Sequence, residues 1–196
     1  MPTRWISKNL GEESFEILDL RDPEIERRIL GEMDAGVDVY YDQRWAATEQ
    51  FSEWLLAQPD QLLGKNVLAL GAGIGLETLA VGRRCQHVWV NDLAPVSVEL
   101  CGEQLQRNGI KNFTPLPGSM TEIPLPAEID LAVACFLIYE TETREAMAKF
   151  CARFPGEILV ANGPLPAFHQ WRENLERPFE IVFEDDSVQA LRLPPR

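Results

Sequence analysis

The stretch from Val67 to Ala80 constrains the fold more than any other part of this chain. An apolar run ends at Leu70, and three alternating glycines follow it, Gly71, Gly73 and Gly75. The apolar run predicts a buried strand. Glycines in this spacing predict a turn at which the backbone approaches a ligand closely, followed by a helix whose N-terminus faces that ligand. We therefore expect a strand–turn–helix unit with a ligand crevice at the turn.

A second apolar run, from His87 to Asn91, leads directly into Asp92, which stands 21 residues after Gly71. In nucleotide-binding units of this kind, a carboxylate about 20 residues beyond the glycine turn accepts hydrogen bonds from a ribose. The spacing predicts a crevice for an adenosine-like group, with Asp92 on the ribose. A dinucleotide fingerprint would have its third glycine where this chain has Leu76, but the glycine comes one residue earlier.

The resulting G-x-G-x-G pattern of Gly71, Gly73 and Gly75 resembles motif I of the class I S-adenosylmethionine (SAM) methyltransferases. The resemblance implies that SAM is the cofactor and that its methionine end lies against the glycine turn. Two alternatives stay open on the residues alone. They are an NAD-type site and a strand–turn–helix unit without a ligand, because short glycine motifs also occur by chance.

Strands and helices alternate through residues 45–196, which predicts a doubly wound α/β fold with a Rossmann-like sheet of about seven strands and helices on both faces. The last two strands flank Asp185-Asp186 and predict a C-terminal antiparallel hairpin. The expected strands cover residues 67–70, 87–91, 113–116, 129–135, 157–161, 179–185 and 187–194. The expected helices cover residues 46–57, 76–82, 95–108 and a segment that contains 147–154.

Residues 1–44 precede this unit as an N-terminal extension, which we expect to be helical. Asp22 is placed to cap a helix, and Pro23 suits its first position. The extension serves either as a lid over the crevice or as packing, and both alternatives stay open. The apolar face of its helix is expected to comprise Ile25, Ile29, Leu30 and Met33.

The charge of the chain bears on its partners. The 196 residues carry a formal net charge of −13. A surface this acidic repels phosphate backbones and lacks the basic stripe that nucleic-acid binding needs, so no nucleic-acid substrate is expected. The methyl acceptor implied by the resemblance is therefore expected to be a protein or a small molecule. A simpler explanation of the charge is that it keeps the protein soluble.

No metal site and no membrane span are expected. The four cysteines form no C-x-x-C pair and fall within apolar patterns, which predicts reduced thiols in the core. With two histidines in the chain, no metal ligand set is complete. No apolar run has the length of a membrane span and no signal peptide begins the chain, so a cytoplasmic protein is expected. The sequence does not indicate an oligomeric state.

Ligands in this fold bind at the carboxyl ends of the strands, so the residues after each strand are candidates for the site. Leu93 is expected over one face of the adenine, with Ser119 and Met120 at its edge and ring. Gly118 and Ser119 could equally form an ordinary turn. Phe136 follows the fourth strand and is expected to border the methyl group. The same place is expected for the residues after the fifth strand, Asn162, Gly163 and Pro164.

Tyr139 and Glu140 are the candidate catalytic residues. Methyl transfer from a sulfonium needs mainly a nucleophile aligned with the methyl group. The Tyr139 hydroxyl could orient that nucleophile, and the Glu140 carboxylate could accept its proton. Each residue has a simpler alternative: Tyr139 as an aromatic lid over SAM, and Glu140 as a charge at the start of a helix.

A closer resemblance runs from about residue 39 to residue 170 and is strongest before residue 95. This part of the chain looks like the seven-strand lysine methyltransferases, especially the electron-transfer-flavoprotein β-subunit lysine methyltransferase group and its bacterial relatives. The resemblance implies a protein side-chain nitrogen as the acceptor and adds Trp45 to the cofactor-binding candidates, where a core aromatic is the alternative. The matching residues are Trp45, Pro59, Asp60, Gly64, Lys65, Asn91 and Asp92.

Three positions depart from that group. Ala69 stands where the group has the acid of motif I, Phe136 replaces the aspartate of a D-x-x-Y motif whose tyrosine is Tyr139, and Asn162 replaces another aspartate. Ala69 is expected on the exposed end of the first strand. Three function classes therefore stay open: a methyltransferase for lysine or another protein nitrogen, a small-molecule N- or O-methyltransferase, and a SAM-binding regulatory protein without turnover.

Overall fold

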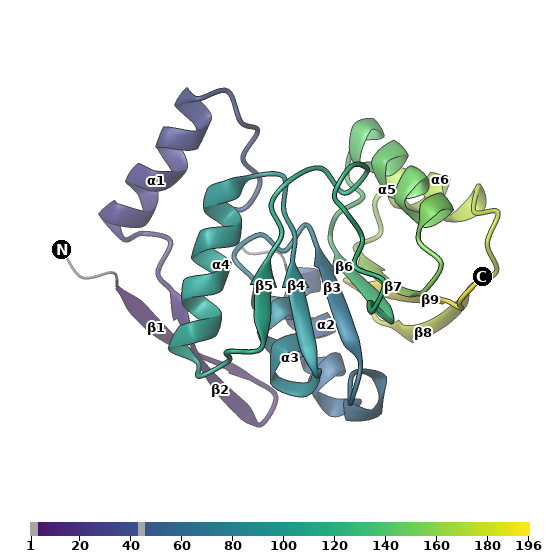
Figure 1. The fold of residues 1–196 in the computed structure, drawn as a ribbon, viewed down its shortest axis with the longest axis horizontal. Coiled ribbons are helices and arrows are strands. Elements are labelled where there is room, and N and C mark those ends of the chain that lie inside the picture. The colour runs from purple at the N-terminus through teal and green to yellow at the C-terminus, as the bar shows by residue number, and fades with distance from the viewer. Residues whose placement is uncertain (1–3, 43–45) are drawn as a thin grey trace.

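A seven-stranded sheet forms the centre of the molecule (Figure 1). The structure is a computed structural model that describes residues 4–42 and 46–196. Each strand predicted from the sequence is present, with ends that differ by a few residues. In spatial order the strands are β5 (Phe113–Pro115), β4 (His87–Val90), β3 (Asn66–Leu70), β6 (Leu131–Cys135), β7 (Glu157–Asn162), β9 (Gln189–Leu193) and β8 (Glu180–Glu184).

The strand order reverses at β3. This strand pairs in parallel with β4 on one side and with β6 on the other. Strands β4 and β5 therefore extend the sheet on one side of β3, and the later strands extend it on the opposite side. In open α/β sheets a ligand crevice lies at such a reversal, at the carboxyl ends of the strands. The last two strands, β8 and β9, pair antiparallel as the predicted C-terminal hairpin. The predicted doubly wound α/β fold is therefore confirmed.

Helices cover both faces of the sheet (Figure 1). Two apolar cores result, one on each face, because successive residues of each buried strand point to opposite sides. The helices on one face are α2 (Ala46–Ala57), α3 (Leu76–Arg84) and α4 (Pro95–Arg107). The helices on the opposite face are α5 (Thr141–Arg153) and α6 (Pro166–Glu173).

Ala69 lies in the core between the sheet and α3. Its neighbours along β3, Leu68 and Leu70, face the opposite side of the sheet. Only 1% of Ala69 is exposed. The expectation that Ala69 stands at an exposed strand end is therefore wrong, because both faces of this central strand are covered by helices.

The N-terminal extension begins with a β-hairpin that the sequence analysis did not predict. Strands β1 (Trp5–Leu10) and β2 (Glu13–Leu18) pair antiparallel. The predicted helix follows as α1 (Pro23–Asp34), with Asp22 Oδ1 accepting a hydrogen bond from Glu24 N at 2.8 Å. The extension is therefore not purely helical. Half of β1 is exposed, and its apolar residues Trp5, Ile6 and Leu10 do not alternate with polar ones, so it lacks the apolar alternation that marks a strand in a sequence.

This extension packs against the main unit. Phe15 of β2 is 1% exposed and belongs to the core beneath α2, α3 and α4. On α1, Ile25 and Ile29 are buried as predicted. Leu30 and Met33, which were expected on the same face, are half exposed at 50% and 51%. The buried stripe of α1 is thus narrower than the sequence pattern indicates.

A 3₁₀ turn, η1 (Pro59–Gln61), precedes β3. All four cysteines are buried and unpaired, as predicted. In the described part of the chain, no helix is both long and apolar enough to cross a membrane.

Candidate functional site

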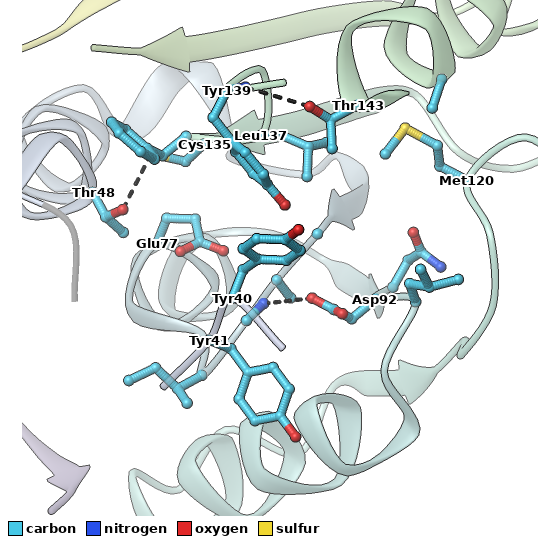
Figure 2. A pocket seen from close by; sticks show the side chains of 18 of the residues that line it. Tyr40, Tyr41, Thr48, Glu77, Asp92, Met120, Cys135, Leu137, Tyr139 and Thr143 are labelled. Atoms are coloured by element: carbon cyan, nitrogen blue, oxygen red, sulfur yellow. Dashed lines mark hydrogen bonds between the residues drawn. The ribbon is translucent and has the colours of Figure 1, made fainter. Parts of the chain in front are cut away.

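A cavity of about 540 Å³ opens at the carboxyl ends of β3, β4 and β6 (Figure 2). This volume lies within the range of roughly 300–1,000 Å³ that is usual for small-molecule sites. The cavity brings together most of the predicted site residues; Trp45 lies outside the described residues, and residues 162–164 do not line the cavity. Those that line it are Gly71, Gly73, Gly75, Asp92, Leu93, Ser119, Met120, Phe136, Tyr139 and Glu140.

The glycine turn forms one wall of the cavity. Gly71, Gly73 and Gly75 have φ angles of 56°, 53° and 79°, a left-handed region that glycine adopts without steric cost. A Cβ on Gly71 would lie 2.2 Å from Leu137 Cδ1, and one on Gly75 would lie 2.3 Å from Cys101 Sγ. A Cβ on Gly73 would meet one atom, at 3.6 Å. The space beside Gly73 is therefore open to a ligand.

Asp92 is fixed between this turn and the start of α4. Its Oδ2 accepts a hydrogen bond from Gly73 N at 2.9 Å, and its Oδ1 accepts one from Ala94 N at 3.0 Å. Burial raises the pKa of Asp92, although both N–H groups oppose that shift. Leu93, the next residue, is 61% exposed at the cavity rim. The carboxylate thus stands beside the turn, where the sequence predicts the ribose.

Asn91 shapes the neighbouring part of the wall. Its Nδ2 donates to Leu116 O and to Gly118 O, both at 2.8 Å. These bonds tie the end of β4 to the loop that carries Ser119 and Met120 into the cavity. The Ser119 hydroxyl also takes part in a local turn. Ser119 therefore takes part in a turn and also lines the cavity, and its place at the adenine edge stays a prediction.

The segment after β6 carries the aromatic residues that were predicted to border the methyl group. Phe136 has a φ of 51°, which is rare for a bulky side chain and is typical of backbone held in place at functional sites. Asn162 of β7 holds this segment: its Oδ1 accepts from Ile138 N at 3.0 Å, and its Nδ2 donates to Ile138 O at 3.1 Å. Residues 162–164 do not line the cavity. The expectation that they border the methyl group is wrong, because Asn162 is buried and directed at the backbone.

Tyr139 meets a second tyrosine inside the cavity. The ring of Tyr40, from the N-terminal extension, lies 4.9 Å from the ring of Tyr139 between centroids, at an interplanar angle of 47° (Figure 2). Burial raises the pKa of Tyr139. Its hydroxyl is therefore protonated at neutral pH and available as a hydrogen-bond donor.

Carboxylates surround this tyrosine pair. Asp38, Glu140 and Glu142 are exposed and line the cavity. Burial and the negative charges of Glu140 and Asp38 raise the pKa of Tyr40. Among the cavity-lining residues that the structure describes, no Lys, Arg or His is present. Glu140 is also the N-cap residue of α5, so its helix-start role and its place at the cavity coexist.

The N-terminal extension supplies part of the site that the sequence analysis missed. Asp38, Tyr40 and Tyr41 all line the cavity. The Tyr41 hydroxyl donates to Glu32 of α1, and Glu32 Oε1 accepts from Val96 N at 2.7 Å. These contacts tie the segment between α1 and α2 to the start of α4. Two adjacent tyrosines in a charged segment are the signal from which this could have been suspected.

A second missed group lines the wall near α2 and α3. It consists of Thr48, Glu77 and Cys135. The sulfur of Cys135 lies 3.6 Å from Thr48 Oγ1. Glu77 is 5% exposed, and its Oε1 accepts a hydrogen bond from Thr78 Oγ1 at 2.9 Å. Acidic residues are common in the first turn of a helix, so the sequence does not set Glu77 apart.

These features fit SAM. The open side of Gly73 allows the close approach that a ligand lying over the turn needs. The Asp92 carboxylate can accept hydrogen bonds from a ribose diol. The buried carboxylate of Glu77 lies in another part of the same cavity, and SAM carries an ammonium group at its methionine end.

The family match decides between the alternatives for this turn. The methyltransferase domain family matches residues 67–154, which run from β3 past the end of α5 and include the glycine turn, Asp92 and Tyr139. Residues 67–154 therefore form a methyltransferase domain, and the fold around them is that of the class I SAM-dependent methyltransferases. SAM is therefore its cofactor.

The proteins that this chain resembles include one of similar sequence and several of similar fold. The electron transfer flavoprotein beta subunit lysine methyltransferase of Rattus norvegicus is 25% identical over 111 residues, which cover 56% of this chain and 43% of that protein. The chain thus spans less than half the length of that curated relative.

Two solved structures illustrate the shared fold. A 16S rRNA methyltransferase from T. thermophilus, in complex with AdoMet and guanosine, has a TM-score of 0.68 at 20% identity. The aligned region covers 98% of this chain and 50% of the T. thermophilus chain. A SAM dependent methyltransferase from Aquifex aeolicus has a TM-score of 0.58 at 17% identity, covering 72% of this chain and 88% of its own.

Proposed function

We propose that this protein transfers a methyl group from SAM to an amine nitrogen of the kind carried by a lysine side chain of a protein. The observation that carries the proposal is the cavity mouth, where Tyr40 and Tyr139 are surrounded by Asp38, Glu140 and Glu142. Aromatic faces attract ammonium groups, and carboxylates concentrate cations at a cleft. The mouth therefore favours a cationic acceptor and disfavours one that carries phosphate or carboxylate groups.

The chemistry left to the protein is alignment and proton removal. SAM, when bound, supplies a methyl group already activated on a sulfonium sulfur. The acceptor nitrogen must lose a proton before its lone pair can attack. The Tyr139 hydroxyl oxygen orients the nitrogen by accepting a hydrogen bond from an N–H of the amine, which leaves the lone pair free. The Glu140 carboxylate accepts the proton and passes it to solvent. Alignment of this kind accounts for a large part of the rate in such reactions.

The loss of the aspartate at position 136 does not remove the negative charge of the mouth. Phe136 stands in that place and is only partly buried. Asp38 comes from the N-terminal extension, and Glu140 and Glu142 come from the start of α5. Carboxylates from other elements therefore supply the attraction for a cation that the D-x-x-Y aspartate supplies in the related group.

A protein acceptor is the first choice for two reasons. Tyr40 is 41% exposed, so the mouth opens at the molecular surface, where a side chain of another protein can enter. The rat relative is named as a lysine methyltransferase. A small-molecule amine is the second candidate, because it offers the same ammonium to the same mouth. The T. thermophilus relative acts on rRNA, but the net charge of −13 weighs against RNA here.

Fractionation of labelled products tests this proposal. The purified protein is incubated with methyl-labelled SAM and a cell lysate, and the protein, RNA and small-molecule fractions are counted separately. Label should enter the protein fraction and should fall strongly with Asp92→Asn, the matched variant expected to bind SAM weakly. Label confined to small amines would favour the second candidate. Label in RNA, or SAM binding without any transfer, would overturn the proposal.

A further inference from the structure

Glu77 is a buried carboxylate on the cavity wall with no partner of opposite charge among the hydrogen bonds and ion pairs of the described residues. It is the second residue of α3, and its Oε1 accepts from the Thr78 hydroxyl at 2.9 Å. It is 5% exposed, yet it lines the cavity. An acid that merely complements a helix N-terminus is normally solvated. Burial of an unpaired carboxylate is costly, which indicates that a ligand group offsets the cost.

The position of Glu77 along the cavity indicates which ligand group this is. Asp92 and Met120 lie on one side of the cavity, whereas Glu77 lies on the other side with Thr48 and Cys135 (Figure 2). The first side comes from β4 and the loop after β5, where the ribose and adenine are expected. A ligand that extends from there across the glycine turn reaches the second side with its opposite end. For SAM that end is the methionine ammonium and carboxylate.

Ala69 supplies an independent reason. The related methyltransferases have an acid at this position, near the methionine end of SAM, and Ala69 leaves that end without it. Ala69 is 1% exposed and faces the side of the sheet that α3 covers. Glu77 is carried by α3 itself, on that same side. A carboxylate from the helix can therefore take the place of a carboxylate from the strand.

We propose that Glu77 binds the methionine ammonium of SAM and so replaces the acid that is absent at position 69. The inference rests on the cofactor part of the proposed function and is independent of the acceptor. The ammonium donates to the Glu77 carboxylate, forming a charge-assisted hydrogen bond in a buried site. Glu77 is thus a positioning residue for the cofactor and takes no part in proton removal from the acceptor.

The test compares two ligands that differ by one group. S-adenosylhomocysteine (SAH) carries the ammonium, and 5′-(3-carboxypropylthio)-5′-deoxyadenosine is the same molecule without it. Calorimetry with the full chain should show that the wild type prefers SAH by about ten- to a hundredfold, the usual worth of a charge-assisted hydrogen bond. In Glu77→Gln this preference should shrink to within a few-fold, with little change in affinity for the ligand that lacks the ammonium.

The matched control is Glu145→Gln, which removes an exposed carboxylate on α5 that does not line the cavity, and it should keep the full preference. An undiminished preference in Glu77→Gln, or an equal loss for both ligands, would overturn the inference while leaving methyl transfer untouched. If Glu77→Gln fails to fold, the wild type still decides: a preference for SAH below threefold refutes the inference. Failure of the wild type to bind SAH at all would overturn the proposed function as well.

Discussion

Asn162 and Ile138 hold each other through two hydrogen bonds that run in opposite directions. Asn162 Oδ1 accepts from Ile138 N at 3.0 Å, and Asn162 Nδ2 donates to Ile138 O at 3.1 Å. A side-chain amide can make both bonds, whereas a carboxylate can only accept. The amide thus ties the end of β7 to the segment that carries Phe136 and Tyr139. Asparagine at this position supports the site without lining the cavity.

Asn162→Asp should therefore destabilise the protein. The aspartate would face Ile138 O without a donor, inside a site with no exposed surface. Loss of the bond and burial of the charge should lower the free energy of unfolding by about 1–3 kcal/mol, which is a fall of several degrees in Tm. Thermal melting checks this, with Asn9→Asp on the exposed face of β1 as the control. Equal melting temperatures for the two variants would show that the hydrogen bonds between Asn162 and Ile138 do not stabilise the protein.

Asp92→Ala should weaken SAH binding by roughly 1.5–3 kcal/mol, because the ribose loses a charged hydrogen-bond acceptor. The same carboxylate accepts from Gly73 N and Ala94 N, so the variant also loosens the turn. Asp92→Asn separates these effects, since its amide oxygen can still accept from one N–H group. Calorimetry measures the affinity and melting measures the fold. Unchanged SAH affinity in both variants would show that Asp92 does not bind the cofactor.

Tyr139→Phe should affect turnover more than cofactor binding. The phenylalanine keeps the ring that meets Tyr40 and removes only the hydroxyl. If that hydroxyl orients the acceptor, turnover should fall by roughly one to two orders of magnitude while SAH affinity stays the same, as for an interaction made mainly in the transition state. Steady-state kinetics on the identified acceptor measures this. Parent-like turnover, together with lost SAH affinity in Tyr139→Ala, would instead assign Tyr139 the role of a lid.

The affinity for SAH should fall as the pH drops below 7. Burial raises the pKa of Glu77 from 4.5 to about 7, and the charge of Asp92 adds to the shift. The other groups near it are the Cys101 and Cys135 thiols, whose pKa values burial also raises, and the uncharged Thr48. An ammonium favours the ionised carboxylate, so below pH 7 binding must first remove a proton from Glu77.

The expected loss of SAH affinity approaches tenfold per pH unit below the pKa. Calorimetry from pH 5.5 to 8 in buffers of different ionisation enthalpy measures both the affinity and the proton released. Glu77→Gln should remove both effects. A pH profile that is identical in the wild type and this variant would assign the titration to another group.

Ala69→Glu should destabilise the protein rather than improve its cofactor binding. Ala69 is 1% exposed in the core beneath α3, so a glutamate there overpacks the core and buries a second acid on the side where Glu77 lies. We expect a loss of about 2 kcal/mol or more in the free energy of unfolding. Thermal melting with and without SAH checks this. A variant as stable as the parent, with tighter SAH binding, would show that position 69 still has room for the acid.

The sequence predicts the parts of the fold and site that depend on local pattern. The seven strands follow from apolar runs, and the glycine turn with Asp92 follows from spacing within one strand–turn–helix–strand unit. The β1–β2 hairpin lacks the apolar alternation that would mark it. Ala69 was misplaced because an alanine does not indicate whether helices cover both faces of its strand.

The missed site residues depend on contacts between distant parts of the chain. Tyr40 reaches Tyr139 from about a hundred residues away, through the packing of the extension on α4. Glu77 has the sequence context of an ordinary helix-start acid, and only its burial distinguishes it. Asn162 was expected at the ligand because it ends a strand, but its side chain bonds to the neighbouring backbone instead.

The measurement that tests the central claim most directly is the chemical identity of the methylated group. Protein labelled with methyl-labelled SAM by the purified enzyme is hydrolysed in acid, and the amino acids are separated and counted. Methylation of an amine at the acidic, tyrosine-lined mouth predicts label that survives hydrolysis and elutes with methylated lysine. Label that is lost as volatile methanol, as from a methyl ester, or label that elutes with another amino acid, would contradict the account.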